Sequence, residues 1–253
     1  MGFEILLGVY ALVALAMGMS FYRNLGIEKD LFLGSIRATV QLIAMGFVLK
    51  WLFTLQEAEN FFLVLLFMTC VAAVISGNRG RAIPNSRIIA LAGIGLGSAV
   101  TFTVLYTAGV IKNEANYIIP IGGMIVGNAM NAASLAMNRL IGELEHARKR
   151  IETLLALGGS ARQAGEEPAR QALKAALIPT IDSMKTIGLV HLPGIMTGFL
   201  IAGGSPLEAV KFQVAVVYMI AGTAGIAGTV VVVLGVRQCF EGNLRMRLER
   251  QDG

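Results

Sequence analysis

The sequence predicts an all-α fold, a polytopic transmembrane bundle of about seven spans with a helical cytoplasmic segment. Of its 253 residues, 55% are hydrophobic and only 15% are charged. The mean hydropathy is +0.69. In soluble domains roughly a quarter of the residues are charged, so this composition favours a chain embedded in a bilayer. Apolar runs are spread over nearly the whole length, which predicts a single transmembrane domain over residues 1–253.

Seven apolar segments are candidates to cross the membrane. A span needs roughly 20 mostly apolar residues to cross about 30 Å of hydrocarbon. The segments are residues 3–22, 31–53, 61–76, 88–110, 117–138, 179–203 and 212–236. The N-terminus has neither the basic region nor the small-residue cleavage site of a secretory signal, so we expect the first segment to be retained.

The basic residues predict the orientation. With the N-terminus outside and the C-terminus inside, sixteen of the 21 basic residues fall in inner loops and in the C-terminal tail, and Lys50, Lys112 and Lys211 fall outside. The pI near 9.4 reflects this asymmetry, so no nucleic-acid partner is expected. Cys70, inside an apolar run, and Cys239, in the basic tail, are expected to be free thiols.

Glycine pairs at a four-residue spacing occur in three of the segments. They are Gly93–Gly97, Gly123–Gly127 and Gly194–Gly198. Small residues at this spacing let membrane helices approach closely, so the main interpretation is helix packing within the chain. Contact between two copies, or use as a hinge, is the alternative.

Residues 139–178 form the long cytoplasmic segment. Leu140, Leu144 and Ile151 recur at helical spacing among charged residues, which predicts an amphipathic helix continuing inward from the fifth segment. Residues 157–160 then break it. Ser160 with Gln163 has the capping-box pattern that starts a short second helix, and Pro168 suits the first turn of a third. The segment is either a solvated connection or a docking element that receives motion from another protein.

The sixth segment carries charge and a predicted break. Asp182 and Lys185 lie one helical turn apart, so they form an interfacial ion pair, or they act as a gate or substrate contact. The Pro193-Gly194 pair, two residues after His191, interrupts the helix and would expose backbone carbonyls. His191 is either a satisfied interior histidine or a contact to substrate or metal.

Polar residues also mark one face of the fifth segment. Asn128, Asn131 and Ser134 follow one another at three-residue spacing, which predicts an interior face used for interhelical hydrogen bonds or for a translocation path. Methionines such as Met196 lie near this path, and we interpret them as packing residues. No spacing resembles a metal site.

The chain carries no recognisable catalytic machinery. A phosphate-binding loop needs Gly-Lys-Ser/Thr, and none of the lysines follows a glycine. Neither an HExxH helix nor a His–Asp cluster occurs beside the spans. We therefore predict a protein that is not an enzyme and has no cofactor of its own. Any ATP-Mg would be bound and hydrolysed by a partner subunit.

Three strings carry a family resemblance: IIPIGGMIVGNAM (residues 118–130), AALIPTIDSMKTIGLV (175–190) and LPGIMTG (192–198). They resemble the FetB-like permeases of bacterial ABC transporters, and the resemblance covers nearly the whole chain. It implies a permease subunit in the bacterial inner membrane that exports iron or another metal ion. It also implies a separate ATPase subunit that contacts residues 139–178. Because ABC transporters need two membrane halves, a homodimer is expected.

The resemblance also suggests where the ATPase docks. Glu152, followed six residues later by Gly158, is similar to the coupling loop of ABC importers, although the following proline, Pro179, lies farther away than in that loop. The expected coupling residues are Glu152, Leu157, Gly158, Gly159, Ser160, Ala161, Gln163 and Ala164. The expected translocation path contains Asn128, Asn131, Ser134, Asp182, Lys185, His191, Pro193 and Met196.

Two other functions compete with this interpretation. A secondary transporter driven by an ion gradient would use Asp182 as its ion site and would need no ATPase. A seven-span receptor or scaffold would use the cytoplasmic segment for signalling and would not require a broken sixth span.

Overall fold

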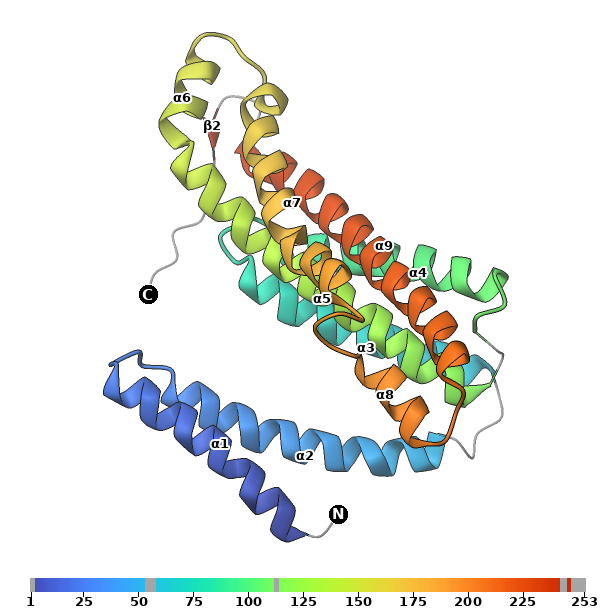
Figure 1. Ribbon diagram of the computed structural model, residues 1–253. Coiled ribbons are helices and arrows are strands. Elements are labelled where there is room, and N and C mark those ends of the chain that lie inside the picture. The colour runs from blue at the N-terminus through green and yellow to red at the C-terminus, as the bar shows by residue number, and fades with distance from the viewer. Residues whose placement is uncertain (1–2, 53–57, 112–113, 242–244, 247–253) are drawn as a thin grey trace. The chain divides into compact units, whose positions relative to one another are not determined.

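The structure is a computed structural model that describes residues 3–52, 58–111, 114–241 and 245–246. Within these ranges the chain is almost entirely helical (Figure 1). It forms two compact units, residues 1–56 and residues 57–253. The single domain expected over residues 1–253 stays a prediction.

The first unit is a hairpin of two apolar helices, α1 (Phe3–Tyr22) and α2 (Glu28–Leu52). Their connection is held by the Ser20 hydroxyl, which donates to Glu28 Oε1 at 2.7 Å. Farther along, the hydroxyls of Tyr10 and Thr39 are hydrogen-bonded to each other. Large apolar side chains such as Leu15 are exposed in the described chain.

The second unit is a helical bundle built around α5 (Figure 1). Its helices are α3 (Ala58–Arg79), α4 (Ser86–Thr107), α5 (Ala115–His146), α6 (Arg148–Ala156), α7 (Ala161–Thr186), α8 (Gly194–Ile201) and α9 (Pro206–Gln238). Helix α5 packs against α3, α4, α7 and α9, and α4 also packs along α9. The core between them is rich in alanine, with Ala90, Ala133 and Ala136 fully buried.

A short strand pair follows α9. β1 (Phe240–Glu241) pairs antiparallel with β2 (Arg245–Met246), and β2 lies beside α6. From the sequence, only a basic tail is expected here. Two residues per strand are too few to produce an alternating pattern, so the sequence carries no periodic signal for this pair.

Close helix packing at glycine is confirmed for one pair, Gly93–Gly97. A Cβ at Gly93 would lie 2.5 Å from Val231 Cγ2 and one at Gly97 would lie 3.1 Å from Ala227 Cβ, both on α9. In the second pair Gly123 lies near Met68 of α3, whereas Gly127 has no atom within 4 Å of its Cβ position. Both glycines of the third pair, Gly194 and Gly198, also have none among the described residues. Packing against the described residues therefore does not explain the third pair.

Five described helices are long and apolar enough to cross a membrane. They are Glu28–Lys50, Phe61–Arg79, Ser86–Thr107, Tyr117–His146 and Pro206–Gln238, and Gly8–Tyr22 is a shorter apolar helix. The sixth predicted span, residues 179–203, is instead a broken element, because α7 ends at Thr186 and α8 begins at Gly194. The chain is thus a multi-span membrane protein, while seven spans and the N-out orientation stay predictions.

Candidate functional site

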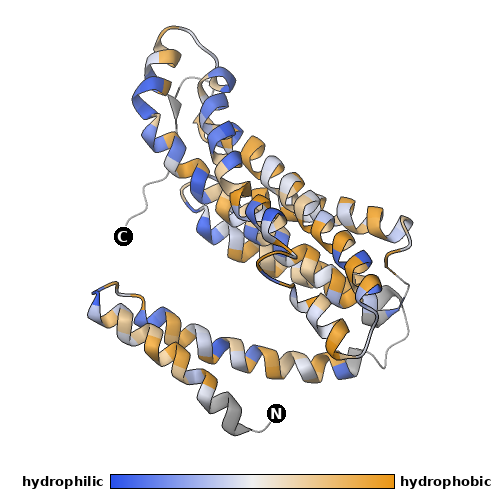
Figure 2. Ribbon diagram, viewed as in Figure 1, coloured by the Kyte–Doolittle hydropathy of each residue, from blue (hydrophilic) through white to orange (hydrophobic). Residues whose placement is uncertain are grey.

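Residues 139–178, the predicted cytoplasmic segment, form a helical hairpin made from the end of α5, from α6 and from the start of α7. Helix α5 has 32 residues, about 48 Å at 1.5 Å per residue, so it is longer than the hydrocarbon core. It breaks at Ala147 and continues as α6. Figure 2 shows hydrophilic residues concentrated on α6 and on the first turns of α7. The predicted amphipathic helix is present, interrupted by one residue.

Two backbone motifs shape the tip of this hairpin. At the end of α6, Gly158 N–H donates to Leu155 O at 3.0 Å and Gly159 N–H donates to Leu154 O at 2.9 Å, with Gly158 at φ +87°. This is a Schellman termination, which favours glycine at the left-handed position. Helix α7 then begins with the predicted capping box between Ser160 and Gln163.

The expectation of separate second and third helices is wrong. Residues 161–186 form one helix that passes through Pro168 and Pro179. Pro168 is buried on the same face as Ala164, Ala172 and Ala176, which pack into the bundle core. Burial of this continuous face holds the helix together where proline removes a hydrogen bond.

The predicted coupling residues divide into an exposed group and a buried group. Leu157 is 81% exposed at the tip, and Gly158, Ser160 and Gln163 are exposed with it. Ala161 and Ala164 are buried, and they belong to the same core cluster as Ile151. The exposed residues form the surface available to a partner, whereas the two alanines hold the hairpin together. Gly159 is half-buried, and a Cβ there would lie 2.8 Å from Leu154 O.

The exposed face of α6 is charged. Arg148 Nε lies 3.0 Å from Glu152 Oε1 in an exposed pair one turn apart. Such a pair contributes only about 0.3–0.5 kcal/mol to stability. Lys149 and Arg150 are also exposed. Glu152 therefore lies on a basic solvent-facing surface next to the tip.

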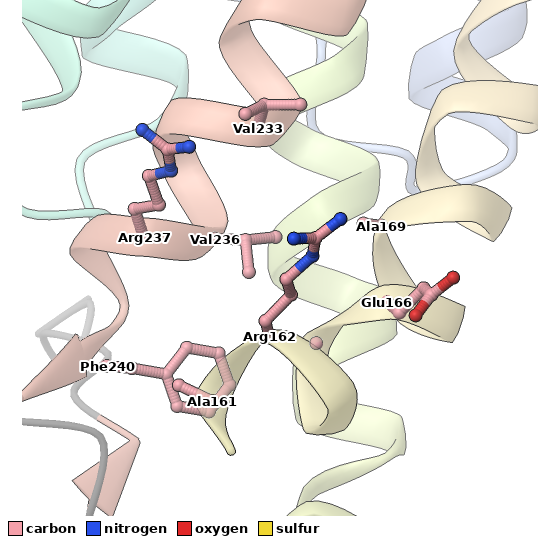
Figure 3. A pocket seen from close by; sticks show the side chains of 9 residues that line it. Ala161, Arg162, Glu166, Ala169, Val233, Val236, Arg237 and Phe240 are labelled. Carbon is pink, nitrogen blue, oxygen red and sulfur yellow. The ribbon is translucent and has the colours of Figure 1, made fainter.

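A cavity of about 600 Å³ lies beside the hairpin, between α7 and α9 (Figure 3). Val233, Val236 and Phe240 supply apolar lining, and Arg162 and Arg237 come from the two helices. The sequence analysis did not predict it, because its residues are separated by about 70 positions in the chain. Only the packing of α7 on α9 brings them together.

A second cavity, of about 650 Å³, lies between the α5–α6 side of the hairpin and α7. Glu143, Arg150 and Glu167 give it a charged lining, to which His146 adds an imidazole. The hydrogen bond from Gln171 Nε2 to Glu167 Oε1, 2.6 Å long, lowers the pKa of Glu167, and Arg170 lowers it further. Glu167 is therefore an anion at neutral pH.

The predicted break in the sixth segment is confirmed. After Thr186 the backbone leaves the helix, and Gly188 N–H donates to the His191 carbonyl at 2.9 Å. Pro193 then caps α8. A third cavity, of about 480 Å³, lies between this break and α9 and is lined in part by Met184, Pro193, Met196 and Gln213. We call it the break cavity.

The charged residues of this region lie outside the break cavity. Lys185 Nζ is 3.7 Å from Asp182 Oδ1, which confirms the expected pairing, and both side chains are largely exposed. His191 is exposed too, so the expectation of a satisfied interior histidine is wrong.

The expectation for the polar face of α5 is also corrected. Asn128 Nδ2 donates to Met124 O of its own helix at 2.8 Å, Asn131 is exposed and Ser134 is half-buried. The predicted interhelical hydrogen bonds are therefore wrong for Asn128, because its amide reaches its own backbone. None of the three lines the break cavity. Gln213, which the sequence analysis did not select, does line it.

No group of three or more His, Cys, Asp or Glu residues that could hold a metal ion occurs in the described part of the chain. Cysteines at positions 70 and 239 are both free.

Comparison with known sequences identifies the family. The profile of the Uncharacterised protein family (UPF0014) matches residues 3–240. The chain belongs to the UPF0014 family. No solved structure matches it.

Relatives in the UPF0014 family come from plants and bacteria. The "UPF0014 membrane protein STAR2" of Oryza sativa subsp. japonica is 40% identical over 230 residues, 91% of this chain and 79% of the relative. The "Probable iron export permease protein FetB" of Escherichia coli (strain K12) is 37% identical over 90% of this chain and 88% of the relative. The "UPF0014 membrane protein YjkA" of Bacillus subtilis (strain 168) is 36% identical over 92% of each chain. The resemblance to FetB-like permeases is thereby confirmed.

Proposed function

We propose that this chain is the membrane-spanning permease subunit of an ABC transporter, driven by a separate ATPase subunit that binds the hairpin tip. The observation that carries the proposal is Leu157, a large apolar side chain that is 81% exposed at the hydrophilic end of the second unit. An exposed leucine held between a Schellman turn and a capping box is a preorganised contact for a partner protein.

Helix α7 supplies the mechanical connection. It runs without a break from Ala161, next to the tip, to Thr186 at the start of the unwound turn, about 39 Å at 1.5 Å per residue. Closure of two ATPase subunits on ATP-Mg would push the tip, and α7 would carry that displacement to the break. The unwound turn between α7 and α8 can change its φ and ψ angles, as hinges do.

The proposal for the cargo and the assembly draws on the relatives. The similarity to FetB, a probable iron export permease, supports export of iron or another metal ion across a bacterial inner membrane. A homodimer would supply the two membrane halves that an ABC transporter needs. The competing ion-gradient mechanism at Asp182 gains no support from the exposed pair with Lys185, since that pair lines no described cavity.

Co-purification with ATP hydrolysis tests the proposal. The tagged chain is purified from membranes of its own organism and assayed for bound ATPase subunit and for ATP turnover. Leu157→Asp is expected to lose both, because a carboxylate cannot be buried unpaired in an interface. The matched control is Thr107→Asp, an exposed position at the far end of α4. Transport by the purified chain alone on an ion gradient would overturn the proposal.

A further inference from the structure

The break cavity contains one polar side chain whose hydrogen bonding is incomplete. Gln213, on α9, is only 6% exposed, and its Oε1 is enclosed without a hydrogen-bond partner among the described residues. Buried side-chain amides are nearly always paired with protein or ordered water. An amide can accept at its oxygen and donate twice at its nitrogen. Gln213 therefore has unused hydrogen-bonding capacity on the wall of this cavity.

The rest of the wall is uncharged. The remaining lining comes from Met184, Pro193 and Met196 of the broken element, from valines of α9, from similar apolar neighbours and from Tyr218. No carboxylate, imidazole, thiol, ammonium or guanidinium group lines it. Iron and harder cations require carboxylate or imidazole ligands, and anions require donors or positive charge. A bare metal ion would therefore find too few ligands here.

The shape and the chemistry of the wall fit a different class of molecule. Sites for small organic molecules are mostly apolar concavities of about 300–1,000 Å³ with a few placed polar groups, and the break cavity, at about 480 Å³, has this composition. We propose that it binds an uncharged organic molecule, apolar over most of its surface, with one hydroxyl or N–H group bound by the Gln213 amide. The proposal rests on the ABC-driven transport proposed above and departs from it on the cargo, since this cavity suits an uncharged organic molecule in place of a metal ion.

The location of the cavity is suited to transport. Gln213 lies 25 residues before Gln238 on α9, about 37 Å away along the helix, and Gln238 is at the end beside the hairpin. The cavity is thus near the opposite end of the bundle from the tip. It is also formed by the unwound turn, so displacement of α7 would change the wall that holds the ligand.

Two matched probes test the assignment on the full chain in lipid nanodiscs. 2-Naphthol has an apolar body and one O–H donor, and 2-methoxynaphthalene has the same body without the donor. We expect saturable binding of 2-naphthol above the background of empty nanodiscs. We expect affinity to fall roughly five- to tenfold for 2-methoxynaphthalene and for Gln213→Leu, the loss of one hydrogen bond. The control Gln238→Leu, an exposed position on the same helix, is expected to bind like wild type.

Three results would overturn the proposal. One is equal binding of the two probes to wild type. Another is saturable binding of ferrous ion that disappears in Gln213→Leu. The third is absence of probe binding together with a changed oligomeric state of Gln213→Leu, which would make the cavity a contact between copies. If Gln213→Leu does not fold, comparing the binding of the two probes to the wild type still tests whether the cavity recognises a hydrogen-bond donor.

The assay also separates this proposal from the transport function. Leu157→Asp, which is expected to lose the ATPase subunit, should bind 2-naphthol as wild type does. Loss of probe binding with intact ATPase coupling would reject the cavity assignment alone.

Discussion

The backbone amide of Gly159 donates to the carbonyl oxygen of Leu154 at 2.9 Å, and this bond closes the last turn of α6 below the exposed Leu157. The position of the proposed docking residue is therefore set by backbone geometry, with Gly158 held at φ +87°.

The first prediction concerns this turn. Gly158→Ala is expected to destabilise the tip locally by about 1–2 kcal/mol, because a Cβ is unfavourable in the left-handed region. Hydrogen exchange at residues 154–164 measures it, with faster exchange expected than in wild type. Gly142→Ala is the control, since Gly142 lies in α5 and has no atom within 4 Å of its Cβ position. Unchanged exchange in Gly158→Ala would show that the turn is not strained by a side chain.

A second prediction concerns the contact of α4 with α9. Gly93→Ala would bring a Cβ within 2.5 Å of Val231 Cγ2 and 3.0 Å of Ala227 O. The free energy of unfolding is therefore expected to fall by about 1–3 kcal/mol. Thermal unfolding in detergent reports it. The matched variant Gly95→Ala has open space and should leave the midpoint unchanged. Adding Val231→Ala is expected to restore part of the loss, and absence of that rescue would assign the effect to another contact.

The third prediction concerns the buried threonines between the same helices. Thr223 Oγ1 lies 2.9 Å from Thr101 Oγ1 and 2.7 Å from Met219 O. A double-mutant cycle with Thr223→Val and Thr101→Val is expected to give a coupling of about 0.6 kcal/mol, the magnitude typical of hydrogen bonds between membrane helices. If the stability losses of the two single variants simply add up in the double variant, the two hydroxyls do not interact.

A fourth prediction follows from burial of Cys239, directly after α9. Burial raises the pKa of its thiol from 9.0 to about 12. Because the folded state holds the proton more tightly, the stabilisation is fully present below pH 9 and is lost as the pH rises through 12. In a Cys70→Ala background, maleimide should label Cys239 only after denaturation, since the thiolate is the nucleophile. Rapid labelling of the folded protein at neutral pH would contradict the burial.

Much of the hairpin could be predicted from local sequence. Glycines at 158 and 159, with Ser160 and Gln163, specify the end of one helix and the start of the next through contacts over a few residues. At Pro168 the local signal predicted a helix start wrongly, because the preference of proline for a first turn is outweighed by packing of the buried face of α7 in the core. The break before Pro193 was predicted for a local reason as well, the proline itself.

The sequence by itself determined that this is a membrane protein of helices, with a charged hairpin at one end and an interruption in its sixth apolar segment. Those properties depend on hydropathy, helical period and backbone chemistry, which act over short stretches. Only the tertiary structure decided which residues meet. It separated exposed Leu157 from buried Ala161 and removed His191 from the interior. It also placed Gln213 opposite Pro193 and Met196. Such contacts join distant positions, and the packing of α7 and α8 against α9 that creates them leaves no periodic signal in the chain.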